Sequence, residues 1–287
     1  MIITHRGLDP SLNNFYNESS KEAFENHLER GYGIEFDVRI TRDRKFVISH
    51  DDNLSRISNG KCTKNISELT EKEILNFVFD GCHLITLDEL LNLISNRQAK
   101  GAISAIHLKA TAQNETSIDL LLSIASKYDV SKFIIFDVKI NTAMYIKKHN
   151  PEFKLAPSVV HKFDKKRFNR FTGNTLFTTK EISKYLKLFS YAWLDEWDRI
   201  DEDEKEKKFY TKETLKYIYD FGLKTILVSP ELHATSPELL GYEKHQDAEN
   251  LMILEKRIYD LISLKPDYIC TDYPDKVKLL YNKMLSL

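Results

Sequence analysis

Long apolar runs and paired cysteines are both missing from this chain of 287 residues. It contains no stretch of 18 apolar residues and does not open with a basic segment followed by an apolar run, so we expect neither a transmembrane segment nor a secretory signal peptide. The three cysteines, Cys62, Cys82 and Cys270, form no CxxC or other metal-binding spacing. We therefore interpret them as reduced structural thiols and expect a cytoplasmic protein.

An excess of charge of one sign is also absent. The 42 basic and 43 acidic residues give a formal net charge of -1, so no global field would attract nucleic acid or an anionic membrane. Linkers rich in proline, glycine or serine are missing too, which favours one domain over residues 1–287. The acidic and lysine-rich run at 198–208 is expected to be a solvated surface segment.

Strand-like and helix-like patterns alternate along the chain. Ser19 with Glu22 three residues later has capping-box spacing, and Thr86 is the expected N-cap of an amphipathic helix at 85–95. Repeated strand–helix units imply parallel strands with right-handed crossovers. Eight such units in under 300 residues favour a closed (β/α)8 TIM barrel, with a loop and short-helix insertion around 52–83.

Glu35 and Asp37 lie two residues apart on the predicted second strand. Because side chains alternate along a strand, both carboxylates project from one face and Phe36 and Val38 from the other. Like charges roughly 6 to 7 Å apart on a buried face are costly unless a cation or a proton is shared between them. The pair therefore predicts a metal site, although an exposed edge strand would show the same alternation.

Other polar residues fall at the ends of predicted strands, where a (β/α)8 barrel carries its reactive groups. His5 and Arg6 close the first strand and place a titratable imidazole beside a fixed phosphate-binding guanidinium. His107 and Lys109 end the third strand, and Asp272 ends the eighth. His50 and Asp51 end a short run after the second strand that can fold back over the same mouth. We interpret these residues as parts of one candidate site.

Several short motifs also resemble the glycerophosphodiester phosphodiesterase family. They are HRG at 5–7, NES and AF within 17–24, EFD with a following TRD at 35–43, HDDNLSR at 50–56, TLDELL at 86–91 and TDYPD at 271–275. The motifs occur in the family's order over essentially the full length of the chain. The HRG, ExD and HD set is specific, whereas TLDELL and TDYPD are weaker signals alone.

The resemblance implies cleavage of a phosphodiester by acid–base catalysis. Matched motif to motif, His5 and His50 would be the general acid and base, and Arg6 and Lys109 would bind the phosphate. The chemistry of these residues agrees, because imidazoles exchange protons near neutral pH and fixed cations stabilise a pentacovalent transition state. In the family, a neighbouring hydroxyl of the leaving alcohol can attack first and form a cyclic phosphate, which water then opens.

The resemblance also makes Glu35 and Asp37 ligands of one divalent metal ion, Mg²⁺ or Ca²⁺. The family's usual third ligand is a carboxylate two residues before the lysine, where this chain has His107. An imidazole removes one negative charge and offers nitrogen, which favours Mn²⁺ or Zn²⁺. Three explanations stay open: His107 binds a softer metal, Asp137 or Glu231 completes a site for a hard metal, or metal binding is impaired.

The sixth and seventh predicted strands depart from the family pattern. The segment VSPELH replaces a Trp-Thr-Val-Asn-like segment, so Glu231 and His233 could face the barrel mouth. Trp193, with Asp195 or Glu196 close by, is expected at the same rim. An aromatic ring beside carboxylates suits an amine or a polyol, so we assign Trp193 and Glu231 to substrate binding. Core tryptophans and acids at a helix start would explain the same residues.

The predicted function is a metal-dependent phosphodiesterase that hydrolyses a glycerophosphodiester, or a glycerol-phosphate-linked sugar, to an alcohol and a phosphomonoester. The expected partner is a small-molecule phosphodiester, and nucleic acid is not expected. One alternative, motivated by His107 and the altered seventh strand, is a catalytically impaired barrel that binds a phosphodiester or phosphorylated glycan without turnover. Another is a lyase or transferase that releases a cyclic phosphate.

Overall fold

The first and last strands of the chain lie side by side. The computed structural model describes residues 1–12, 16–200, 205–234 and 245–286. In it, β1 (Ile2–His5) pairs in parallel with both β2 (Gly33–Ile40) and β13 (Tyr268–Thr271). Pairing of the first strand with the last is expected when parallel strands close into a barrel.

The remaining strands follow in order around the barrel axis. β2 pairs with β6 and β6 with β7, while β13 pairs with β12 and β12 with β11, all in parallel. These strands span Ser104–His107 (β6), Phe133–Phe136 (β7), Tyr191–Asp195 (β11) and Lys224–Val228 (β12). Each of the four coincides with an apolar run of the sequence.

The strand that closes the barrel is interrupted at Pro157, which separates β8 (Lys154–Ala156) from β9 (Ser158–Val160). β8 pairs with β7 and β9 pairs with β11. The backbone N–H of Trp193 donates to the carbonyl oxygen of Pro157 over 3.1 Å. A short strand, β10 (Leu176–Phe177), is added in parallel to the far edge of β9. The predicted (β/α)8 barrel is confirmed.

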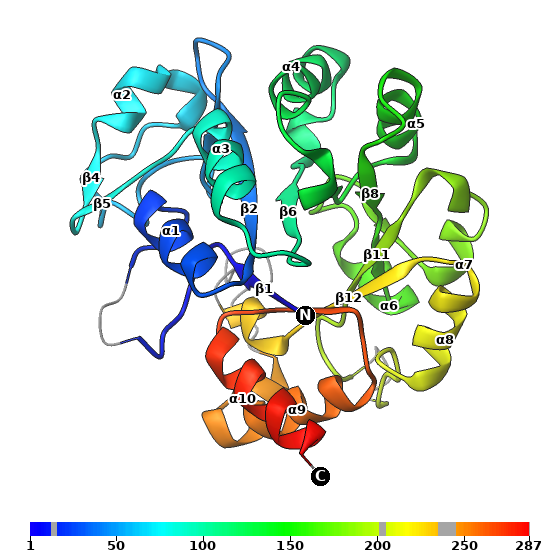
Figure 1. The fold of residues 1–287 in the computed structure, drawn as a ribbon. Coiled ribbons are helices and arrows are strands. Elements are labelled where there is room, and N and C mark those ends of the chain that lie inside the picture. The colour runs from blue at the N-terminus through cyan, green and yellow to red at the C-terminus, as the bar shows by residue number, and fades with distance from the viewer. Residues whose placement is uncertain (13–15, 201–204, 235–244, 287) are drawn as a thin grey trace.

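Helices surround the barrel and cover its outer face (Figure 1). Their amphipathic patterns turn an apolar side toward the strands, as expected for helices of this fold. They are α1 (Lys21–Glu29), α3 (Leu87–Arg97), α4 (Glu115–Ala125), α5 (Ile140–His149), α6 (Lys162–Phe168), α7 (Thr179–Ile182), α8 (Lys212–Asp220), α9 (Leu251–Ser263) and α10 (Pro274–Leu285). Within the described ranges, no helix has the length and apolar character needed to cross a membrane.

Two predicted helix starts can be compared with the structure. Thr86 is the N-cap of α3, with a complete capping box to Glu89, so this prediction is confirmed. The first helix begins differently: Ser20, not Ser19, is the N-cap of α1 and accepts from the N–H of Ala23. Ser19 instead has φ +58°. The sequence did not distinguish the two adjacent serines, because either provides a hydroxyl at capping distance.

Side chains of β2 point alternately to the outside and to the inside of the barrel. Ile34 and Phe36 point outward into the cluster between strands and helices, whereas Glu35 and Asp37 point into the barrel. A smaller apolar cluster fills the barrel interior below the polar groups; its members include Ile3, Ala105, Ile134, Ala156 and Ile226. The strand begins at Gly33, where a Cβ atom would lie 1.9 Å from the carbonyl oxygen of Ile103. Glycine therefore permits the close approach of β2 to the segment before β6.

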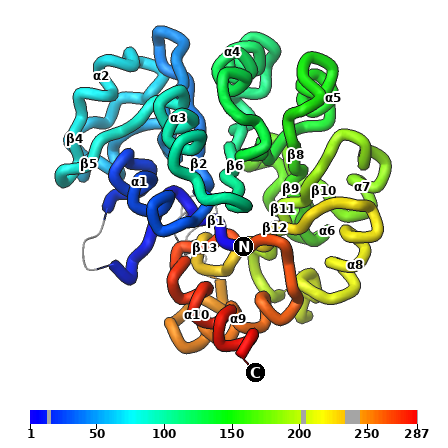
Figure 2. Tube along the Cα trace, in the orientation of Figure 1, coloured from blue at the N-terminus to red at the C-terminus, as the bar shows by residue number. Residues whose placement is uncertain are grey.

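Residues 46–83 form a lobe beside α1 and α3 that has its own small apolar cluster. β3 (Phe46–Ile48) folds back antiparallel to β2. The lobe continues with η1 (Ile66–Glu68), α2 (Glu71–Leu75), β4 (Val78–Phe79) and β5 (Cys82–His83). The tube in Figure 2 shows the lobe packed against one side of the barrel. The three cysteines, two of which lie in this lobe, are buried and free.

The acidic and lysine-rich run at 198–208 is partly buried, contrary to the prediction of a solvated segment. The side chain of Lys207 is fully buried, and its Nζ contacts the carboxylates of Asp164 and Asp198. Residues 201–204 lie outside the described residues. Composition alone could not reveal the burial, because it depends on Asp164, a carboxylate 43 residues away on α6.

Candidate active site

The C-terminal ends of the barrel strands surround a cavity of about 130 Å³. This is the end at which such barrels carry their chemistry. Most of the predicted site residues line the cavity, namely His5, Arg6, Glu35, His50, His107, Lys109 and Trp193. Asp37 lies directly behind them and contacts both His107 and Lys109. The structure therefore brings together residues from five separate segments of the sequence.

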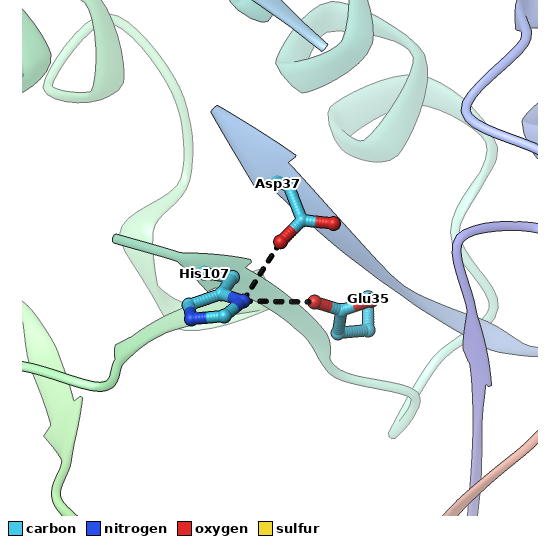
Figure 3. Close-up of side chains that lie close together, drawn as sticks. All are labelled: Glu35, Asp37 and His107. Carbon is cyan, nitrogen blue, oxygen red and sulfur yellow. Dashed lines mark ion pairs between the residues drawn. The ribbon is translucent and has the colours of Figure 1, made fainter. Parts of the chain in front are cut away.

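Glu35, Asp37 and His107 form a compact group of potential metal ligands (Figure 3). Nδ1 of His107 lies 2.7 Å from Oδ1 of Asp37 and 3.8 Å from Oε1 of Glu35. One donor atom from each residue lies within 4.8 Å of the other two. The residues meet because Asp37 of β2 is in register with His107 of β6, and Glu35 is two residues earlier on the same face.

The two carboxyl groups differ in their affinity for protons. Burial, followed by the charge of Asp37, raises the pKa of Glu35 to about 8. Burial acts in the same direction on Asp37, but Lys109 and the nearby imidazoles outweigh it and hold the pKa of Asp37 well below its usual range. Without a cation, Glu35 thus retains a proton near neutral pH while Asp37 is ionised.

This group fits a divalent cation. Oε2 of Glu35 is buried and, within the described part of the chain, has no hydrogen-bond partner, which is costly for a polar atom unless a ligand meets it. Two carboxylates and an imidazole form a mixed donor set that suits Mn²⁺ or Zn²⁺ as well as Mg²⁺. His107 is the third donor that the structure provides. Asp137 lies on the other side of the ring, with Oδ2 3.3 Å from Nε2 of His107, where it can orient the imidazole.

His5 ends β1 and is paired with a carboxyl group beyond the last strand. Its Nδ1 lies 2.9 Å from Oδ1 of Asp272, which leaves Nε2 for a ligand. Burial, followed by Arg6, holds the pKa of His5 well below its usual range. Burial raises the pKa of Asp272 to about 8. The contact between the two groups therefore orients the imidazole without making it a permanent cation.

His50 lies just beyond β3, at the base of the lobe. Its Nδ1 is 2.7 Å from Oδ1 of Asp51, and Nε of Arg56 is 2.7 Å from Oδ2 of the same carboxylate. Arg56 also contacts Glu18 over 2.5 Å, which ties the lobe to the loop after β1. Burial, followed by the two cations of the cavity, holds the pKa of His50 well below its usual range. In both histidines, Nδ1 is thus oriented by a carboxyl group.

Arg6 and Lys109 supply positive charge to the cavity. Nζ of Lys109 lies 2.6 Å from Oδ1 of Asp37, and Nε of Arg6 lies 3.4 Å from Oδ2. Arg6 has φ +55°, and its backbone N–H donates to the carbonyl oxygen of Glu35 over 3.0 Å. Gly7, with φ +71°, completes this tight turn, where a Cβ would lie 2.9 Å from an atom of α1. The turn holds a guanidinium beside the lysine, and such a pair suits an anionic phosphate.

An aromatic stack crosses the barrel next to the potential ligands. The ring of His107 stacks on Phe136 with a centroid distance of 4.6 Å, and Phe136 stacks on Trp193 at 3.9 Å. Trp193 is buried and lines the cavity. The stack fixes the plane of the His107 imidazole and provides an apolar surface on the side of β11.

Glu231, like Asp37, does not line the cavity, and its carboxyl group is bound by neighbouring strand ends. Its Oε1 accepts from the hydroxyl of Thr271 over 2.5 Å and from the backbone N–H of Asp272 over 3.0 Å, and its Oε2 accepts from the hydroxyl of Ser229 over 2.5 Å. Burial, followed by Asp272, raises the pKa of Glu231 to about 7. These bonds tie the ends of β12 and β13 behind the pair of His5 and Asp272. Glu231 therefore contacts the backbone of Asp272 and lies outside the lining of the cavity.

Substitution of Glu231 by leucine is expected to lower the free energy of unfolding by about 3 kcal/mol, because two hydroxyls and a backbone N–H lose a buried acceptor. Urea unfolding followed by circular dichroism measures the change. The exposed Glu249 is a matched control. Its change to leucine is expected to lower the free energy of unfolding by less than about 0.5 kcal/mol. Wild-type stability with a raised KM in Glu231→Leu would instead indicate a direct contact with substrate.

The sequence motifs assigned no catalytic or binding role to three acids that support the site. They are Glu18, Asp51 and Asp272, which contact Arg56, His50 and His5, respectively. A signal for each was present, because they belong to the NES, HDDNLSR and TDYPD motifs. The motifs alone did not separate residues that orient a histidine from residues that touch a ligand.

The sequence profile of the glycerophosphoryl diester phosphodiesterase family matches residues 5–276. The chain therefore belongs to this family. A glycerophosphodiester phosphodiesterase from Bacillus altitudinis is 31% identical over 105 residues, which cover 34% of this chain and 41% of that protein. The chain spans less than half the length of the curated relatives that it matches first.

Solved structures share the fold over nearly the whole chain. A glycerophosphodiester phosphodiesterase described as putative, from Galdieria sulphuraria, has a TM-score of 0.69 at 16% identity, with 98% of this chain and 97% of that chain covered. A phosphodiesterase from Oleispira antarctica, in complex with the product sn-glycerol-3-phosphate, has a TM-score of 0.63 at 16% identity, with 98% and 96% covered. At these identities the likeness shows the common barrel.

Proposed function

We propose that the protein hydrolyses a glycerophosphodiester to an alcohol and a phosphomonoester. The observation that carries the proposal is the meeting, at one cavity, of two carboxylate-oriented histidines, two fixed cations and a group of potential metal ligands. Membership of the phosphodiesterase family supports the same activity. So does the product bound to the structurally similar phosphodiesterase from Oleispira antarctica.

His5 and His50 act as general acid and base in this proposal. Each imidazole turns Nδ1 toward a carboxylate, so Nε2 is the nitrogen that exchanges a proton with substrate or water. Burial and the cavity cations keep both pKa values low in the free protein, so either ring can accept a proton. A bound phosphodiester anion offsets the charge of Arg6 and Lys109. Substrate binding therefore raises the proton affinity of the histidines and allows one to serve as the acid.

The charged residues between the histidines hold the phosphate. Arg6 and Lys109 bind its anionic oxygens and stabilise the charge that grows there in the transition state. Glu35, Asp37 and His107 hold one divalent cation, which when bound supplies further stabilisation of that charge. Asp37 also lies between the two cationic side chains and fixes their positions relative to the ligand group.

Phosphorus NMR of a glycerophosphodiester incubated with the purified protein tests the proposal. With Mg²⁺, Ca²⁺, Mn²⁺ or Zn²⁺ added in turn, we expect the diester signal to be replaced by that of a phosphomonoester with at least one of the metals. Binding of the diester without turnover under every metal would contradict hydrolysis and favour a binding protein. A cyclic phosphate that persists as the final product would indicate a lyase or transferase.

A further inference from the structure

The cavity wall formed by β11 and β12 carries polar groups that the proposed catalysis does not use. In the strand order of the barrel, β11 lies opposite β2 and β12 lies opposite β6, so this wall faces the potential metal ligands. Asp195 ends β11, Trp197 follows two residues later, and His233 lies in the short helix η5 (Pro230–Ala234) after β12. All three line the cavity. We call these three residues the far wall.

The charges of the far wall are matched in pairs. Nε2 of His233 lies 3.1 Å from Oδ1 of Asp195. Burial lowers the pKa of His233, but the carboxylate of Asp195 outweighs it and raises the pKa above its usual range. Behind this pair, the buried amino group of Lys207 contacts Asp164 and Asp198, and the guanidinium of Arg167 contacts Asp198 as well. The carboxylates of this region therefore already have cationic partners, and they do not form a free anionic site for an ammonium group.

Trp197 offers a hydrogen-bond donor that is not in use. Its side chain is 7% exposed, and its Nε1 has no hydrogen-bond partner in the described part of the chain. The indole ring packs on Phe168 with a centroid distance of 4.2 Å, which holds it in place. A buried N–H without an acceptor is costly unless a ligand provides one. Asp195, whose side chain is 20% exposed, offers carboxylate acceptors at the same wall.

A buried tyrosine holds the strand ends that carry the far wall. The hydroxyl oxygen of Tyr210 lies 2.8 Å from the carbonyl oxygen of Leu194 and 3.0 Å from that of Val228, and it accepts from the backbone N–H of Glu196. Leu194 and Glu196 flank Asp195 in the sequence, so Tyr210 holds the chain on both sides of Asp195 and joins β11 to β12. The acceptor groups of the wall are thus positioned before a ligand arrives, which reduces the entropy lost on binding.

We propose that the far wall binds the alcohol part of the diester and that this part is an uncharged polyhydroxy group, such as a sugar or a cyclitol. The inference rests on the proposed function and specifies its substrate class. One hydroxyl donates to Asp195 and another accepts from Nε1 of Trp197, while the ring of Trp193 provides an apolar surface. A choline or ethanolamine group would meet a carboxylate already paired and would leave the indole N–H unsatisfied.

The test compares glycerophosphodiesters that differ only in the second alcohol: inositol, choline, ethanolamine or methanol. For the wild type, we expect kcat/KM for the inositol diester to exceed that for the choline diester by at least about tenfold, because a site built for hydroxyls rejects groups that lack them. Trp197→Phe keeps an aromatic ring and removes the N–H. It is expected to lower kcat/KM for the inositol diester by about tenfold, with a much smaller effect on the methanol diester.

Two comparisons keep the test specific to the far wall. Tyr217→Phe, on the exposed side of α8, also removes one polar group from an aromatic side chain. It is expected to leave kcat/KM for all four diesters unchanged. Asp195→Asn removes the carboxylate and is expected to lower the preference for the inositol diester as well, which provides a second variant if Trp197→Phe unfolds. A wild-type preference for the choline or ethanolamine diester overturns the inference. So does an equal loss on the inositol and methanol diesters in both variants.

Failure of the proposed function gives a different result. In that case the wild type hydrolyses none of the four diesters. Calorimetric titration of the same diesters then decides the inference: tighter binding of the inositol diester, weakened about tenfold by Trp197→Phe, supports the far wall as a polyol subsite. Equal binding of all four diesters, or binding of none, overturns it.

Discussion

Replacement of His5 by asparagine is expected to lower kcat for glycerophosphodiester hydrolysis by about a thousandfold, within the range typical of acid–base groups. Asparagine keeps a polar amide beside Asp272 but cannot transfer a proton near neutral pH. His50→Asn is expected to cause a similar loss. Because the acid and the base act in one reaction, the double variant should be only slightly slower than either single variant. Steady-state kinetics on a phosphodiester measure all three.

The control for these variants is His149, an exposed histidine on α5. His149→Asn is expected to retain wild-type kcat and melting temperature. The fold of the active-site variants is checked by their circular dichroism and by binding of the intact diester, neither of which needs a proton transfer. Wild-type turnover in His5→Asn or in His50→Asn would contradict the assigned acid–base pair.

The second large effect is expected at Asp37. Asp37→Asn should weaken binding of a divalent cation by more than about 100-fold, because changes to groups that merely orient metal ligands already cost 10–100-fold. It also leaves Lys109 and Arg6 without their shared carboxylate. We therefore expect kcat to fall by about a thousandfold. Titration with Mn²⁺, followed by electron paramagnetic resonance, measures metal binding independently of activity.

A matched control for the metal prediction is Asp260→Asn, which changes an exposed carboxylate on α9 and should leave metal affinity unchanged. His107→Asp tests the third donor directly. A carboxylate at this position restores a negative charge, so the affinity for Mg²⁺ and Ca²⁺ is expected to rise relative to that for Zn²⁺. Unchanged relative affinities in His107→Asp, or undiminished Mn²⁺ binding in Asp37→Asn, would contradict this group of ligands.

The arrangement of the candidate site followed largely from local patterns in the sequence. The alternation of Glu35 and Asp37 with apolar neighbours fixed their common face, and the barrel architecture then placed His5 and His107 at the same end. These inferences succeeded because period-two alternation is a local property, and because repeated strand–helix units define the order of parallel strands in a barrel.

Side-chain contacts between distant segments could not be predicted from these local sequence patterns. Glu231 was expected at the cavity, but its partners Ser229 and Thr271 lie on two strand ends that the sequence could not align. Lys207 was predicted to lie in a solvated run, but in the structure it is buried beside Asp164. In both cases the outcome depended on whether a buried polar group found partners far along the chain, which composition does not report.

The interruption of a strand at Pro157 changes the number of strands with height along the barrel. Below the proline, β8 pairs with β7, and the wall has eight strands. Above it, β9 pairs with β11 on one side and with β10 on the other, so β10 forms this part of the rim. Thr172 and Leu176, which precede and begin β10, line the cavity. The interruption at Pro157 therefore brings the segment 172–176 to the rim of the same cavity as the far wall.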